Sequence, residues 1–83
     1  MQNGTTVAVN LGRALIIVQI DHGDFAVFEL LDAIEVAVGD QVRGDLEALA
    51  CEELQHLGQR CGFNVYGQTG PGSLNAGKRL LGI

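Results

Sequence analysis

The amino-acid sequence predicts a single mainly-β domain over residues 1–83, rolled into a small barrel of five or six strands with one or two short helices. Three observations favour this fold class. Short segments of alternating apolar and polar residues recur along the first half of the chain, and turn-forming residues separate them. The length of 83 residues is enough for one domain and not for two.

The first predicted elements are strands joined by tight turns. Residues 5–11 alternate between apolar and polar, which is the pattern of a half-buried strand. After Gly12, a run rich in β-branched residues covers residues 15–20, either as a second strand or as the continuation of one strand bent at the glycine. Turn-forming residues at 21–24 then predict a hairpin, with its return strand over residues 25–31.

Two of these strands are apolar on both faces. In the return strand, Phe25 and Val27 are expected on one face and Ala26 and Phe28 on the other, while residues 14–18 are apolar throughout. Strands with two apolar faces are normally covered on both sides. In a small barrel one face lines the interior, so the outer face is expected to meet a helix, a loop or a second subunit.

The later elements are shorter. Residues 34–38 alternate as a short strand or an extended approach to a turn, and residues 42–46 predict another short strand. Leucines at three- to four-residue spacing predict a helix over residues 46–58, and a strand over residues 63–67 follows. A glycine-rich loop then leads to a predicted final helix over residues 74–81.

The segment 38–44, VGDQVRG, resembles a phrase common in OB barrels of the ribosomal RNA-binding type and in related translation-factor barrels. Gly39 and Asp40 suit a turn, Val42 is expected to point inward, and Gly44 allows a sharp bend. The order of strand meander, helix and further strand is also similar to that of the OB barrel. The resemblance implies a small OB-like barrel, with an SH3-like barrel as the alternative fold.

Charge and cysteine content limit which partners and which cellular compartment are expected. Ten acidic residues against five basic ones give a net charge of −5, which disfavours nucleic acid and anionic lipid as partners. The longest apolar run is too short to span a bilayer, so no membrane association is expected. Two cysteines do not make a disulfide framework, and the N-terminus does not look like a signal peptide. A cytoplasmic protein with reduced thiols is therefore expected.

A metal site is the first chemical possibility that the sequence raises. Cys51, His56 and Cys61 have the spacing of three of the four ligands of a zinc knuckle. The fourth ligand would fall at Ala48, which cannot bind metal. On a helix over residues 46–58, Cys51 and His56 would also point in different directions. No metal or cofactor is therefore expected, although a small zinc-binding protein stays as an alternative.

Catalytic motifs are incomplete. Residues 72–78, GSLNAGK, fit the first positions of a P-loop, but Arg79 stands where the magnesium-binding Ser or Thr belongs. Too little chain follows to form a nucleotide-binding domain. No catalytic triad can be assembled from the spacing of thiols, histidines and hydroxyls, so no catalytic residue is assigned and an enzyme is not expected.

These observations favour a non-catalytic barrel that binds a protein partner, or associates with itself, through the outer apolar strand face. A homodimer is the simplest version of this hypothesis. The alternative is an OB-type binder of single-stranded nucleic acid, especially RNA. Its contacts would be Arg13, Phe28, Arg43 and Tyr66, by stacking on bases and pairing with phosphates. No motif indicates a specific biological role.

Overall fold

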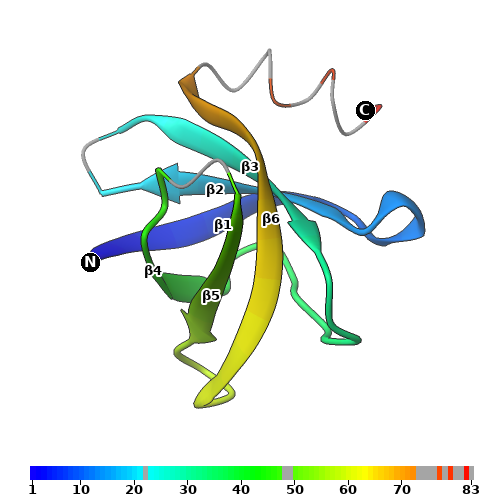
Figure 1. The fold of residues 1–83 in the computed structure, drawn as a ribbon, viewed down its shortest axis with the longest axis vertical. Coiled ribbons are helices and arrows are strands. Elements are labelled where there is room, and N and C mark those ends of the chain that lie inside the picture. Colours follow the sequence, from blue (N-terminus) through cyan, green and yellow to red (C-terminus); the bar gives the residue numbers. More distant parts are fainter. Residues whose placement is uncertain (22, 48–49, 73–76, 78, 80–81, 83) are drawn as a thin grey trace.

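A computed structural model describes residues 1–83 except 22, 48–49, 73–76, 78, 80–81 and 83. Six antiparallel strands form a closed ring in the order β1-β2-β3-β6-β5-β4 (Figure 1). The elements are β1 (Gln2–Asn10), the 3-10 turn η1 (Leu11–Arg13), β2 (Leu15–Ile20), β3 (Phe25–Leu30), β4 (Gln41–Gly44), β5 (Cys51–His56) and β6 (Cys61–Gly72). The prediction of a small mainly-β barrel is confirmed.

The ring consists of two three-stranded meanders, β1-β2-β3 and β4-β5-β6. Two antiparallel seams join them, because β3 pairs with β6 and β1 pairs with β4. The chain passes from the first meander to the second through residues 31–40, which contain no helix. The structure therefore lacks a counterpart of the helix that usually connects the third and fourth strands of an OB barrel.

Turn geometry explains where the first strands end. Residues 15–20 are a separate second strand, because η1 and Ala14, with a φ of 54°, reverse the chain after β1. Gly23 has a φ of 105° in the predicted hairpin between β2 and β3, a conformation that glycine adopts without steric cost. Residues 34–38 are an extended approach to a turn rather than a strand.

The helix predicted over residues 46–58 is wrong, because residues 51–56 form β5. Leu54 and His56 are buried and alternate with exposed neighbours, which is the period of a strand. The helical spacing of leucines came from different elements. Leu46 turns inward just after β4, whereas Leu57 is exposed beyond the end of β5.

Two predictions fall largely on residues that the structure does not describe. They are the final helix over residues 74–81 and the P-loop-like segment 72–78. Within them, Gly77 and Arg79 have helical backbone. In the described part of the chain, no helix combines the length and the apolar character needed to cross a membrane.

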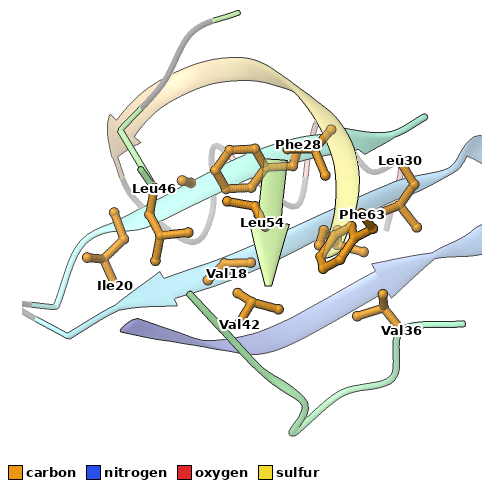
Figure 2. Close-up of a cluster of buried hydrophobic side chains, with 12 residues drawn as sticks. Val18, Ile20, Phe28, Leu30, Val36, Val42, Leu46, Leu54 and Phe63 are labelled. Atoms are coloured by element: carbon orange, nitrogen blue, oxygen red, sulfur yellow. The ribbon is translucent and has the colours of Figure 1, made fainter. Parts of the chain in front are cut away.

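One cluster of apolar side chains fills the interior of the barrel. Its largest members are Phe28 and Phe63, and Figure 2 shows Phe63 on the same side of the cluster as Leu30 and Val36. Val36 comes from the segment between β3 and β4, so this connection closes the core at one end. Each fully buried side chain of this size stabilises the fold by about 1.5–3 kcal/mol.

A second, outer cluster covers the other face of the first meander. It contains Ala8, Ile17 and Val27, all buried, and Phe25 packs against it. The sequence-based assignment of Phe25 and Val27 to one face and Ala26 and Phe28 to the other is therefore confirmed.

The chain itself supplies the cover for this outer cluster. Gly77 is buried against it, and a Cβ at this position would lie 3.1 Å from Ile17 Cδ1 and 3.3 Å from Val27 Cγ2. Such distances are tighter than most contacts that a real Cβ makes. The sequence left a helix, a loop or a second subunit as the possible cover of this face. In the structure, Gly77 of the same chain lies on it.

We expect Gly77→Leu to lower the free energy of unfolding by about 1–3 kcal/mol, because the new side chain must displace Ile17 and Val27. Urea denaturation followed by circular dichroism measures this change. Gly12→Ala is the control, since the nearest atom to its Cβ would be Asn10 Oδ1 at an ordinary 3.5 Å. Equal effects of the two substitutions would contradict close packing at Gly77.

A bulge in β1 changes which of its residues face the outer cluster, and Val9 beyond it packs against the inner cluster. The register between β1 and β2 shifts between Thr6 and Ala8, and Thr6 is fully buried while Ala8 belongs to the outer cluster. The Thr6 hydroxyl is also the single buried side-chain polar atom, among the described residues, that lacks a hydrogen-bond partner. A buried hydroxyl without a partner destabilises the folded state.

Replacing this hydroxyl by a methyl group is therefore expected to stabilise the protein. Thr6→Val should raise the free energy of unfolding by about 1 kcal/mol, since it removes the desolvation cost of the unpaired oxygen. Thr6→Ser keeps the hydroxyl and removes a buried methyl, so it should lower stability by about 1 kcal/mol. Thermal and urea unfolding compare the two, and a Thr6→Val protein as unstable as Thr6→Ser would show that the oxygen has a partner.

Candidate functional site

Three connections lie at one end of the barrel, which we call the crossing end. They are η1 between β1 and β2, residues 31–40 between β3 and β4, and residues 57–60 between β5 and β6. The antiparallel order of the strands brings them to the same end. In Figure 1 they lie along the right and lower sides of the molecule.

Polar side chains attach the middle of residues 31–40 to the second meander. Asp32 Oδ2 accepts hydrogen bonds from the backbone N–H of Asn64 at 2.7 Å and from its side-chain amide at 3.2 Å. The side-chain amide of Gln59 donates to the backbone carbonyl of Glu35 at 2.8 Å. The stretch between Asp32 and Glu35 is thus held at both of its ends.

The last part of this connection is held by a buried histidine. His56, in β5, is only 3% exposed, and its Nε2 lies 2.8 Å from Asp40 Oδ2. The backbone N–H of Gln59 donates to His56 Nδ1 at 3.0 Å. Because Nδ1 accepts a hydrogen bond, the ring proton is on Nε2 and is donated to the Asp40 carboxylate.

The pKa of Asp40 is lowered from its ordinary value of 3.8. The main cause is the backbone N–H of Ala37, which donates to Asp40 Oδ2 at 2.9 Å, and the hydrogen bond from His56 adds to it. A carboxylate whose pKa is lowered by folding stabilises the protein above its unfolded pKa. This stabilisation is lost as the pH falls through the lowered value.

Asp40→Ala should therefore destabilise the protein by about 1–3 kcal/mol at neutral pH, because it leaves the buried His56 Nε2–H without a partner. The difference from wild type should hold down to about pH 4 and shrink below it. Urea unfolding at several pH values measures both effects. Asp21→Ala, an exposed carboxylate at the opposite end, is the matched control, and an equal loss there would contradict the role of the Asp40–His56 contact.

The sequence-predicted zinc candidates do not come together. His56 and Cys61 face each other across β5 and β6, but Cys51 pairs with Tyr66 at the other end of β5, roughly 16 Å along the strand. Both ring nitrogens of His56 are also occupied, by Asp40 and Gln59. Within the described ranges, no three His, Cys, Asp or Glu side chains are placed to hold a metal ion.

The sequence-predicted nucleic-acid contacts are dispersed. Phe28 is 0% exposed inside the barrel, so it offers no ring face on which a base can stack, and it is removed from the candidates. Arg43 and Tyr66 are exposed but pair with opposite ends of β5, at Gln55 and Cys51. The fourth candidate, Arg13, lies at the crossing end, where a Cβ on Gly82 would be 2.8 Å from its Nη1.

The crossing end carries two hollows that share residues 32–35. The smaller has a volume of about 380 Å³ and is lined by Leu11, Ala14, Leu30, Asp32, Ala33, Ile34 and Glu35. The larger, of about 490 Å³, adds Gln59, Cys61, Gly62 and Phe63 to the shared segment. Both volumes fall within the range of about 300–1,000 Å³ that is typical of ligand sites.

Exposed apolar side chains gather in the same three connections. Leu11, Leu31, Val38 and Leu57 are 57%, 50%, 66% and 42% exposed. Sequence reasoning missed them because it assigned each to a strand or helix face. A signal was nevertheless present, since three of the four directly precede a glycine at the start of a turn: Leu11-Gly12, Val38-Gly39 and Leu57-Gly58.

Comparison of the chain with protein-family models, with curated proteins and with solved structures found no match. The site is therefore interpreted from its own geometry. It is a partly apolar surface at one end of a small closed barrel, and the carboxylates of Asp32 and Glu35 line its hollows.

Proposed function

We propose that the protein is a non-catalytic binding module that holds a protein partner at the crossing end of its barrel. The observation that carries this proposal is the gathering of Leu11, Leu31, Val38 and Leu57, all exposed, in the connections at that end. Single exposed apolar residues are common on protein surfaces, whereas several around hollows are typical of interaction sites.

The position of Gly77 supports this surface over the outer strand face. Ile17 and Val27 are already buried, with Gly77 packed against them. A homodimer through that face would first require Gly77 to move away. The crossing end requires no such rearrangement, because its apolar residues are exposed in the folded chain.

The polar groups of the crossing end support a binding role rather than catalysis. The two nitrogens of His56 are engaged in holding Asp40 and the Gln59 backbone, so its geometry serves the fold. Asp32 and Glu35 line both hollows, and their carboxylates repel phosphate groups. This arrangement favours a protein partner over nucleic acid.

The proposal predicts that removing the exposed apolar side chains abolishes partner binding without unfolding the barrel. The test protein carries Leu11→Ser, Leu31→Ser and Val38→Ser, and its fold is checked by circular dichroism. Immobilised wild type and variant are compared for the proteins that they retain from cell extract, and sedimentation velocity reports self-association. We expect at least a tenfold loss in the triple variant, since it removes three apolar side chains whose burial against the partner would favour binding, and about 1.4 kcal/mol corresponds to a factor of ten.

Tyr66→Ser is the matched control, because Tyr66 is 41% exposed but lies on β6 away from the crossing end. It should retain the same partner as wild type. Equal retention by the wild type and the folded triple variant would overturn the proposal. A wild type that retains nothing specifically and does not self-associate would overturn it as well.

A further inference from the structure

The smaller hollow combines apolar walls with acidic groups at its margin. Leu11, Ala14, Leu30 and Ile34 provide the walls, and Asp32 and Glu35 provide the carboxylates. In the part of the chain that the structure describes, no Lys or Arg lines either hollow. The hollow is therefore suited to a group that is apolar along its length and cationic at its end.

Resting on the proposed function, we infer that the hollow accepts a Lys or Arg side chain from the protein partner, with its head group at Glu35. The aliphatic stem of such a side chain packs well on apolar surface while its charged head stays at the margin. Arginine is also among the residues most enriched at the energetic centres of protein interfaces.

Glu35 is the carboxylate best placed to receive the cation. Asp32 Oδ2 already accepts two hydrogen bonds from Asn64, which reduces its capacity for another donor. Glu35 is exposed, and the hydrogen bond from the Gln59 side chain to its backbone carbonyl holds the Glu35 backbone in place. Arg13, the cation in the connection that supplies Leu11 and Ala14 to the hollow, has its guanidinium beside Gly82 and is not part of the lining.

The rigidity of the segment favours binding. Because the Asp32 carboxylate is bonded to Asn64 and the Glu35 backbone carbonyl to Gln59, the backbone that carries both acidic side chains is positioned before a partner arrives. Binding then loses little conformational entropy in this part of the protein. The same carboxylates repel an acidic side chain, so the hollow discriminates by charge as well as by shape.

The exposed apolar residues beside the hollow indicate that the cation belongs to a protein rather than to a free amine. Leu11 lines the hollow, and Leu31 directly precedes its acidic segment. A small amine fills only the hollow, whereas a side chain carried on a polypeptide also covers these neighbours. Such surrounding contacts exclude water from a central charged pair.

The test uses amide chemical shifts of the full ¹⁵N-labelled chain, titrated with three probes of similar length: butylguanidinium, n-butanol and butyrate. We expect butylguanidinium to give saturable shifts at Ala14, Ile34 and Glu35, n-butanol to bind at least fivefold more weakly, and butyrate to leave these signals unmoved. Added salt should weaken the binding of butylguanidinium, because exposed charge pairs are screened.

Glu35→Gln should weaken butylguanidinium binding at least fivefold. Glu53→Gln is the matched control, since it removes the same charge from an exposed position on β5 and should leave binding unchanged. Equal affinity for butylguanidinium and n-butanol, or no effect of Glu35→Gln, would overturn the inference. Either result would leave the proposed function intact, because that function is judged by the triple serine variant.

A short acetylated and amidated peptide, Leu-Arg-Leu, distinguishes the source of the cation. Tighter binding of this peptide than of butylguanidinium supports a protein side chain as the occupant. Equal affinity would mean that the neighbouring apolar residues add nothing, and it would overturn the assignment to a protein partner.

Discussion

The closure of the strand ring is the constraint on which the rest of the structure depends. After β3 the chain must pass to the far side of the barrel, because β4 pairs with β1 while β3 pairs with β6. Residues 31–40 make this passage without a continuous strand partner, so side chains such as Asp32, Gln59 and His56 hold it in place. The same passage places apolar residues at the surface, and the candidate site is therefore a product of how the barrel closes.

Features with a local cause could be predicted from the sequence. The alternation in β3 assigns Phe25 and Val27 to one face because the period of a strand is fixed by its geometry. Gly23 marks the hairpin because its φ of 105° suits glycine. The helix over residues 46–58 failed because Leu46 and Leu54 come from two elements whose inward residues happen to lie at helical spacing.

Features that arise from distant parts of the chain could not be predicted. Asp40 and His56 are 16 residues apart, and only the pairing of β4 with β5 brings their side chains together. The sequence showed that β3 has two apolar faces, yet it did not show which one faces inward, so Phe28 was assigned a contact with nucleic acid. The carboxylates of the smaller hollow were likewise not singled out, because Leu11 and Ala14, which line the hollow with them, come from the distant connection between β1 and β2.

The packing of Gly77 on Ile17 and Val27 has a consequence for biosynthesis. Strands β1 to β3 are synthesised before Gly77, which packs on one of their apolar faces. In the nascent chain, Ile17 and Val27 therefore lack this cover until Gly77 has emerged. Contacts between residues so far apart in the sequence slow folding, and uncovered apolar surface of this kind attracts chaperones and promotes aggregation until the contact has formed.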